Sequence, residues 1–221
     1  MTKRKLARFA ELHTFTNVLQ PKHEEFIHDR YPLKGKWASG FFKNKNPVVL
    51  ELGCGKGEYT IGLAEKYPQT NFIGIDIKGD RLWRGGKTSI EKGLKNVAFL
   101  RLSIEYISFL FAENEISEIW ITFPDPQPNK PKTKKRLTSP AFLDRYQKII
   151  IPKGIIHLKT DNAGLFEYTV EVLKERNHSI LFITRDLHKS NITDDILSIR
   201  TYYENIYLKK EIPICYLNFT L

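Results

Sequence analysis

A glycine-rich segment directly after an apolar run constrains the fold more than any other feature of this chain. Residues 47–50 read Pro-Val-Val-Leu, and residues 51–57 read Glu-Leu-Gly-Cys-Gly-Lys-Gly. Glycine lacks a Cβ and adopts positive φ without strain, so a buried strand can turn sharply here and lead into a helix. The pattern therefore predicts a strand, a turn that exposes bare backbone to a ligand, and a helix.

A second apolar run ends in an acid. Residues 71–76 read Asn-Phe-Ile-Gly-Ile-Asp, so that Asp76 stands at the tip of a second predicted strand. An acid at this point can accept hydrogen bonds from the hydroxyls of a ribose. Together the two segments predict a site for a cofactor that contains a nucleoside. A glycine turn without a ligand is the alternative, and Asp76 makes it the less favoured one.

The spacing of the glycines separates two classes of cofactor. The NAD fingerprint G-x-G-x-x-G would place its third glycine at the position of Glu58. A glutamate there disfavours a pyrophosphate, because its carboxylate would repel an anion bound at the same helix N-terminus. S-adenosylmethionine has a ribose and a sulfonium cation but no phosphate, and it is the cofactor we expect. The expected contacts are Glu51, Gly53, Gly55, Gly57 and Asp76.

The distribution of charge points to a polyanionic partner. The formal net charge is +10. Residues 1–10 carry four basic side chains and no acid, and residues 130–136 carry five and no acid. The alternative is that the basic residues serve only to keep the protein soluble. Their clustering favours a polyanionic partner, and nucleic acid is the first candidate.

Length and composition narrow the class of protein. The 221 residues suffice for one large domain with a full core. No apolar stretch approaches the roughly 20 residues that span a bilayer, and no apolar signal core follows the basic N-terminus. Cys54 and Cys215 show no metal-binding spacing. We expect a cytoplasmic monomer or homodimer that binds no metal and no membrane.

Strands and helices alternate from residue 47 onward. The expected strands are 48–52, 72–77, 97–102, 116–123, 154–159, 179–184 and 213–221, and the expected helices are 57–67, 80–93, 104–112, 141–150, 163–176 and 201–210. This alternation predicts an α/β fold, a doubly wound, mostly parallel seven-stranded sheet with helices on both faces. We expect this domain over residues 47–221, after a basic, irregular extension at residues 1–46 whose first ~20 residues form a mobile tail.

In such a sheet the ligand lies beyond the carboxyl ends of the strands, where the strand order reverses. This rule gathers residues from five predicted strands onto one rim. They are Glu51, Asp76, Ser103, Asp125 and Asp161. Asp125 lies within Phe-Pro-Asp-Pro at residues 123–126, where two prolines restrict the backbone on both sides of one carboxylate. The alternative for Asp125 is a solvated aspartate in a proline-rich turn.

Two further acids remain open between a structural and a substrate role. Asp161 could be the N-cap of the helix that follows it. Glu204 could complete a capping box with Thr201 in the first turn of a helix. From spacing alone, these structural readings and contact with a substrate are about equally favoured.

The ordered set of motifs resembles one family. The glycine motif, residues 123–126, the Lys-Lys-Arg-Leu-Thr of 134–138, the Lys-Thr-Asp of 159–161 and the Thr-Tyr-Tyr-Glu of 201–204 occur in the order found in bacterial tRNA (guanine-N7-)-methyltransferases, which are class I S-adenosylmethionine-dependent enzymes. The resemblance covers about residues 20–221. It implies transfer of a methyl group to N7 of a guanine in the variable loop of tRNA.

The resemblance also implies roles for individual residues. S-adenosylmethionine contacts are implied at Glu51, Asp76, Ser103, Ile104 and Asp125, with a catalytic role for Asp125. Contacts with tRNA or its guanine are implied at Lys130, Asp161, Thr201, Tyr202, Tyr203 and Glu204. Three positions depart from the family pattern: Gln127 replaces a usual tryptophan, Ser103 stands where an acid is expected, and the segment before Lys130 is longer.

Two rival functions are consistent with parts of the sequence. A methyltransferase acting on an exocyclic amine of DNA or RNA often carries Asp/Asn-Pro-Pro-aromatic at the same strand end, whereas Pro126 is followed here by Gln127. A non-catalytic RNA-binding protein with a relic cofactor pocket is the second rival. The intact glycines, with Glu51 and Asp76, argue against such decay.

Overall fold

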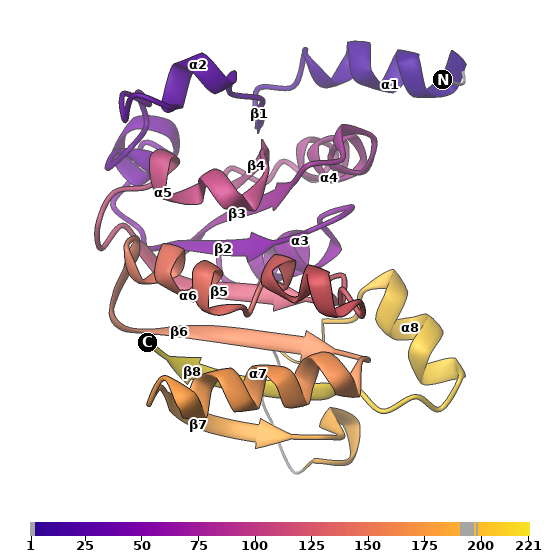
Figure 1. The fold of residues 1–221 in the computed structure, drawn as a ribbon. Helices are drawn as coiled ribbons and strands as arrows, with labels where there is room; N and C mark the ends of the chain where they lie inside the picture. Colours follow the sequence, from indigo (N-terminus) through magenta and orange to yellow (C-terminus); the bar gives the residue numbers. More distant parts are fainter. Residues whose placement is uncertain (1–2, 191–196, 198) are drawn as a thin grey trace.

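One mixed β-sheet with helices on both faces forms the centre of the computed structural model, which describes residues 3–190, 197 and 199–221, the side chains of 3–5 and 130 excepted (Figure 1). The sheet has eight strands in the order β1-β4-β3-β2-β5-β6-β8-β7. The strands are β1 (Val18–Leu19), β2 (Val48–Leu52), β3 (Asn71–Asp76), β4 (Val97–Arg101), β5 (Ile116–Thr122), β6 (Ile150–Thr160), β7 (Ser179–Thr184) and β8 (Cys215–Thr220). Strands β1 to β6 pair in parallel, and β8 runs antiparallel to β6 and β7.

Two apolar clusters cover the two faces of this sheet. The helices are α1 (Lys3–Leu12), α2 (His23–Phe26), α3 (Glu58–Lys66), α4 (Gly79–Glu91), α5 (Ile107–Leu110), α6 (Pro140–Gln147), α7 (Ala163–Glu175) and α8 (Tyr202–Lys209), with the short turns η1 (Trp37–Phe41), η2 (Ile104–Tyr106), η3 (Lys130–Lys135) and η4 (Leu187–Lys189). One cluster joins α5, α6 and α7 to the sheet, and the other joins α1, α3 and α4. Successive strand residues alternate between them: Val49 belongs to the second cluster and Leu50 to the first.

The predicted α/β fold is confirmed, with a correction to the number of strands. The strands predicted at 48–52 and 179–184 agree with β2 and β7 residue for residue. The count of seven is wrong by one, because Val18 and Leu19 pair with Phe99 and Leu100 of β4 at the edge of the sheet. A two-residue strand is too short to show an alternating pattern. The helix predicted over 141–150 ends at Gln147, and the chain enters β6 at once.

Residues before 47 contain regular structure that their sequence did not predict. Helix α1 packs along α4, where Trp83 donates a hydrogen bond from Nε1 to Glu11 (2.7 Å) and Arg8 lies 4.5 Å from the centre of the Trp83 ring. Trp37 is fully buried, stacks on Phe111 and belongs to the first cluster. In α1 the apolar residues Leu6, Phe9 and Leu12 do recur every three residues, which is compatible with a helix. Trp37 makes its contacts with distant elements, and no local periodicity reveals those.

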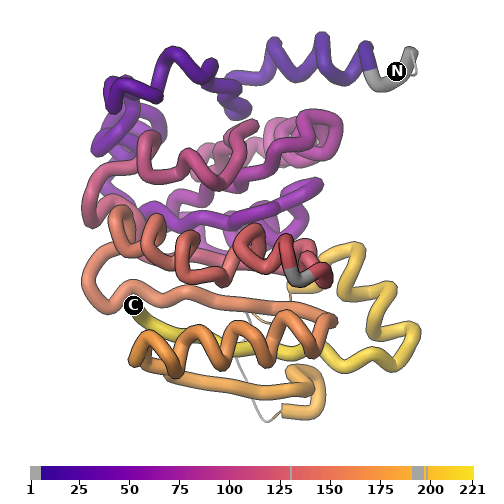
Figure 2. The backbone as a smooth tube through the Cα atoms, in the orientation of Figure 1, coloured from indigo at the N-terminus to yellow at the C-terminus, as the bar shows by residue number. Residues whose placement is uncertain are grey.

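The order of the strands places the ligand-binding edge. The chain runs from β2 outward to β3 and β4, then crosses to β5 on the other side of β2, so the strand order reverses between β2 and β5. The carboxyl ends of these strands point to one edge of the sheet, where α8 lies, while the C-terminus of the chain lies at the opposite edge (Figures 1 and 2). Ligands of doubly wound folds bind at such a reversal.

Candidate functional site

The glycine turn between β2 and α3 has the predicted geometry. Gly53, Gly55 and Gly57 all have positive φ, of 76°, 57° and 72°. The amides of Gly53 and Cys54 both donate to the carbonyl of Ile75 (2.8 and 3.0 Å), which ties the turn to the tip of β3. At Gly57 a Cβ would lie 2.4 Å from the Phe99 ring, so no other residue fits there without movement. The three glycines thus have the positive φ values that the turn was predicted to need, and Gly57 in addition packs directly against Phe99.

Glu51 lies beneath this turn and is only 3% exposed. Its carboxylate accepts hydrogen bonds from the backbone amide of Thr60 (2.8 Å) and from the hydroxyls of Thr60 and Thr122, the latter at 2.5 Å. Burial raises the pKa of Glu51 to about 7, against the lowering effect of the threonine hydrogen bonds. The sequence did not reveal either threonine partner, because both become neighbours of Glu51 only when α3 and β5 pack around β2.

Asp76 connects the two cofactor motifs found in the sequence. Its carboxylate accepts hydrogen bonds from the amides of Gly55 (3.0 Å) and Lys78 (2.8 Å). The side chain is 8% exposed and lines the cleft described next. A carboxylate offers about four lone-pair sites. Asp76 can therefore brace the turn and still accept hydrogen bonds from a ligand.

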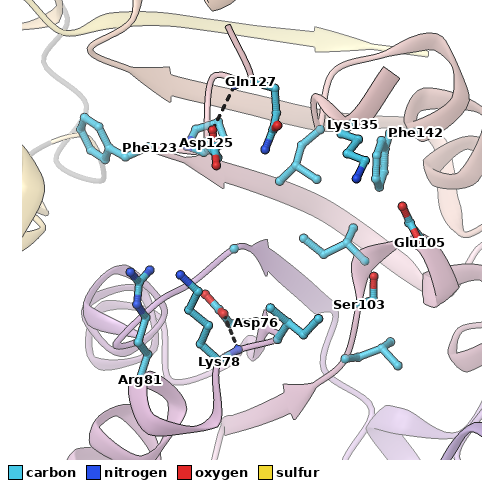
Figure 3. A pocket seen from close by; sticks show the side chains of 16 residues that line it. Asp76, Lys78, Arg81, Ser103, Glu105, Phe123, Asp125, Gln127, Lys135 and Phe142 are labelled. Atoms are coloured by element: carbon cyan, nitrogen blue, oxygen red, sulfur yellow. Dashed lines mark hydrogen bonds between the residues drawn. The ribbon is translucent and has the colours of Figure 1, made fainter. Parts of the chain in front are cut away.

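A cleft of about 370 Å³ opens at the carboxyl ends of the strands, and Figure 3 shows its lining side chains. Its lining residues are Gly53, Asp76, Ile77, Lys78, Arg81, Leu102, Ser103, Ile104, Glu105, Phe123, Pro124, Asp125, Gln127, Lys135, Leu137 and Phe142. Asp76, Lys78 and Arg81 lie on one wall, and Asp125, Gln127 and Lys135 lie on the wall that faces it (Figure 3). Five residues predicted from sequence therefore meet here: Gly53, Asp76, Ser103, Ile104 and Asp125.

The loop that carries Asp125 has an unusual backbone. Phe123 and Gln127 both have positive φ, 48° and 45°, which non-glycine residues rarely adopt. The Asp125 carboxylate is exposed and accepts a hydrogen bond from the Gln127 amide (3.0 Å). One strained residue thus lies on each side of the carboxylate. Each lowers the stability of the fold by about 1–2 kcal/mol, and such strain is typical of functional sites.

Arg136 holds this loop from outside the cleft. Its guanidinium donates to the carbonyls of Pro126 (3.0 Å) and Gln127 (3.3 Å) and lies 4.3 Å from the centre of the Tyr168 ring. The sequence suggested Arg136 only as one of a cluster of phosphate-binding cations. In the structure its contacts are structural, and they are directed to the two residues that follow Asp125.

Asp161 is not the N-cap of α7. Asn162 takes that role, because its side-chain oxygen accepts the amide of Leu165 (2.8 Å). The Asp161 carboxylate instead hydrogen-bonds Tyr207 of α8, and burial together with this acid raises the pKa of Tyr207. The Tyr207 ring stacks on Phe123 at 5.9 Å. Tyr207 therefore links the ends of β5 and β6 to α8.

The segment before α8 lies against the glycine turn. Thr201 is the N-cap of α8 and accepts the amide of Glu204 (3.2 Å). The Tyr202 amide donates to Glu58 (2.6 Å), and Lys56 lies 4.7 Å from the centre of the Tyr202 ring. A second cleft of about 60 Å³ opens between the two segments. The predicted residues that line it are Glu51, Gly53, Gly55, Thr201, Tyr202 and Tyr203.

Three predicted residues line neither of these two clefts in the described part of the chain. Gly57 lies inside the turn, Asp161 lies beside Tyr207, and Glu204 is fully buried. The Glu204 carboxylate is bonded to Lys159 and His188, so only the Thr201 half of the predicted capping box forms. Lys130 begins the turn η3, but its side chain lies outside the described residues.

Both walls of the cleft carry cations. Lys135, which belongs to the basic segment 130–136 marked in the sequence, faces the cleft together with Lys78 and Arg81 of the opposite wall. No cluster of side chains that could ligate a metal occurs among the described residues. Within the same described ranges, no helix has the length and apolar character needed to cross a membrane.

Comparison with known proteins identifies the family of this chain. Residues 45–217 match the family described as "Putative methyltransferase". Over 221 residues the chain is 52% identical to the tRNA (guanine-N(7)-)-methyltransferase of Christiangramia forsetii, with 100% of this chain and 99% of that protein covered. The chain belongs to the tRNA (guanine-N7-)-methyltransferase family. The enzyme of the same name from Bacteroides fragilis is 49% identical, over 100% of this chain and 87% of its own.

Solved structures show the same fold at low sequence identity. The 16S rRNA methyltransferase KamB superposes with a TM-score of 0.62 at 13% identity, covering 82% of this chain and 90% of its own. A structure described as an antibiotic-related methyltransferase also has a TM-score of 0.62, at 17% identity over 93% of this chain and 96% of its own. These likenesses support the fold of class I methyltransferases.

Proposed function

We propose that this protein transfers the methyl group of S-adenosylmethionine to N7 of a guanine in the variable loop of tRNA. The observation that carries the proposal is the arrangement of two walls around one cleft. One wall holds the glycine turn with Asp76, and the other holds Asp125 on a strained loop. Membership of the tRNA (guanine-N7-)-methyltransferase family supports the reaction and the substrate.

The groups on the first wall fit S-adenosylmethionine. Asp76 has lone pairs left for the ribose hydroxyls, and Ile77, Leu102 and Ile104 give an apolar surface for a purine ring. Glu51, with its raised pKa, is a carboxyl group that a nearby cation would favour in its ionised form. We assign this cofactor site to Glu51, Gly53, Gly55, Gly57, Asp76, Ser103, Ile104 and Asp125. The bound cofactor supplies an electrophilic methyl group on a sulfonium.

Asp125 faces the place where charge develops on the acceptor. The N7 atom of neutral guanine carries a free lone pair, so no residue has to remove a proton before attack. The purine gains positive charge as the methyl group arrives, and a fixed carboxylate stabilises that charge. Alternatively, Asp125 accepts hydrogen bonds from the N1–H and N2–H groups of the guanine and aligns N7 for attack. Both roles require the rigid position that the strained loop provides.

Residues beside the second wall are suited to hold the guanine and its tRNA. Asp161, Thr201, Tyr202 and Tyr203 come from the ends of β6 and the start of α8, next to the glycine turn. We include Lys130 in the acceptor site as the family resemblance implies. The resemblance implies the same for Glu204, but its burial points to a different role, which is developed below. Tyr202 and Tyr203 are 54% and 45% exposed, and exposed rings of this kind stack on unpaired bases.

Basic groups around the cleft account for binding of the tRNA backbone. Lys78 and Arg81 lie on one wall and Lys135 on the other, so phosphates on either side of an inserted base would meet a cation. We propose that residues 47–221 form the methyltransferase domain and that the basic N-terminal extension adds to this surface. Such contacts bring affinity and a steep dependence on salt.

A methyl-transfer assay on unmodified tRNA tests the proposal. The tRNA is digested to nucleosides after reaction, and N7-methylguanosine is the expected product. A methyl group on an exocyclic amine would overturn the assigned acceptor atom. Binding of S-adenosylmethionine is measured separately by calorimetry, and absence of binding would support a relic pocket. A tRNA with adenosine at the variable-loop position is the substrate control and should accept no methyl group.

A further inference from the structure

A fully buried ion pair lies where β6 meets α8. Lys159, at the carboxyl end of β6, and Glu204, in the first turn of α8, are both 0% exposed. The Nζ atom of Lys159 lies 2.9 Å from Oε2 of Glu204. The reaction proposed above gives no role to Lys159, and the family resemblance counts Glu204 among the residues that touch the guanine.

Lys159 also holds the chain that leads into α8. Its ammonium group makes longer hydrogen bonds to the carbonyls of Leu197 (3.4 Å) and Ile199 (3.5 Å), and it lies 5.2 Å from the centre of the Tyr59 ring. Burial lowers the pKa of Lys159, and the attraction of Glu204 opposes that effect. The Lys159 ammonium group at the end of β6 thus contacts α8, through Glu204, and the carbonyls of Leu197 and Ile199.

The second oxygen of Glu204 is also engaged. Oε1 lies 3.1 Å from Nε2 of His188, a residue of η4 that is 25% exposed. The carboxylate therefore bridges two basic side chains from different elements and faces neither of the two clefts. Unlike Asp76, which lines the first cleft, Glu204 is fully buried, so its remaining lone pairs are not accessible to a guanine bound in either cleft.

The pair holds one side chain of the first turn of α8 in the protein interior. Tyr202 and Tyr203 precede Glu204 directly in the same helical turn and line the second cleft. The contacts of Tyr202 with Glu58 and Lys56 involve exposed side chains, and such contacts contribute little. Breaking a buried pair by removing one partner leaves an uncompensated buried charge, whereas neutralising both partners is mild.

We propose that Lys159 and Glu204, with His188, are positioning residues that fix the start of α8 beside the cofactor turn, and that Glu204 does not touch the guanine. This inference rests on the proposed function, because it assigns the tyrosines of α8 to the acceptor site. It separates two roles for Glu204 that its sequence motif cannot distinguish: counter-ion of a buried lysine, or ligand of the base.

A double variant separates these roles. K159M and E204Q, each alone, should raise the KM for tRNA by about tenfold or more and lower the melting temperature, because each leaves half of the pair buried and uncompensated. K159M/E204Q removes both charges and should regain most of the stability, with a tRNA KM within about threefold of wild type. Affinity for S-adenosylmethionine, measured by calorimetry, should stay within about twofold throughout.

The same experiment can overturn the proposal. If K159M/E204Q melts like the wild type and binds the cofactor but is as inactive as E204Q, Glu204 contacts the base directly. If E204Q alone keeps the wild-type KM, the pair has no positioning role. Failure of the wild type to form N7-methylguanosine would instead reject the proposed function. The wild-type assay is therefore done before any variant is measured.

A milder variant keeps the test open if these variants fold poorly. H188A frees one oxygen of Glu204 while leaving the buried pair intact, so it should raise the tRNA KM about threefold with kcat and cofactor affinity unchanged. K189A, at the adjacent exposed position, is the matched control and should leave the KM unchanged. Equal KM values for H188A and the wild type would count against the proposal.

Discussion

The two walls of the cleft are built in different ways. The polar part of the cofactor wall is made within residues 51–78, where amides of the glycine turn bond to Ile75 and Asp76 on the next strand. The acceptor wall comes from four separate segments, namely residues 123–127, Arg136, Asp161 and α8, joined through side chains. One wall is held by backbone hydrogen bonds between neighbouring strand tips, and the other by individual tertiary contacts.

This difference has a consequence for substitutions. A defect in the cofactor wall alters a backbone turn and should affect both stability and cofactor affinity. A defect in the acceptor wall removes one contact among several, so it should affect turnover or tRNA binding while the cofactor still binds. The variants below test that distinction, from the largest expected effect to the smallest.

Replacement of Asp125 by alanine should have the largest effect and should separate the walls most clearly. Turnover should fall by about a hundredfold to a thousandfold, the loss typical of a group that stabilises developing charge. Cofactor affinity by calorimetry should stay within about tenfold, because the glycine turn and Asp76 remain in place. E113A, at an exposed acid beyond the amino end of β5, is the control. Turnover of D125A within tenfold of wild type would contradict the assigned role.

Substitution at Gly57 tests the cofactor wall. G57A places a Cβ about 2.4 Å from Phe99 and forces positive φ on alanine, so unfolding should become easier by about 3–4 kcal/mol. G55A is the matched variant, because its Cβ would meet nothing within 4 Å and only the backbone strain of about 1 kcal/mol applies. Urea unfolding measures both. Equal losses for the two variants would show that the contact with Phe99 is unimportant.

The pH dependence of stability tests the burial of Glu51. Its pKa is about 7 in the folded protein, raised from 4.5, so the folded state favours the protonated carboxyl group. This contribution is fully present below pH 4.5 and is lost as the pH rises through about 7, which amounts to about 3 kcal/mol. E51Q should lack this decline in the free energy of unfolding. Parallel pH profiles of E51Q and the wild type would argue against the raised pKa.

Arg136 tests whether the Asp125 loop needs its outside support. R136A should lower kcat by about tenfold, because the carbonyls of Pro126 and Gln127 lose their charged donor. K132A, at an exposed neighbour in η3, should change only the tRNA KM and its dependence on salt. If R136A instead behaves like K132A, Arg136 binds phosphate and does not support the loop.

Much of the cofactor wall could be predicted from local patterns. Residues 47–57 and 71–76 predict a strand, a turn and a second strand, because apolar runs, glycines and a terminal acid lie within a few residues of one another. The family motifs likewise led to Asp125 and to residues 201–204. The sequence did not reveal Thr60 or Thr122, because each joins the site through packing around Glu51, and it did not show which lysine of the basic segment 130–136 faces the cleft.

By itself, the sequence determined the order of the main strands and helices from residue 47 onward, the glycine turn and the acids at the strand ends, since all of these depend on local backbone preferences and apolar runs. Only the tertiary structure decided what each acid does. Asp125 is exposed on the cleft, Asp161 is bonded to Tyr207, and Glu204 is enclosed by Lys159 and His188. Burial and choice of partner depend on the packing of distant segments, which a linear motif does not encode.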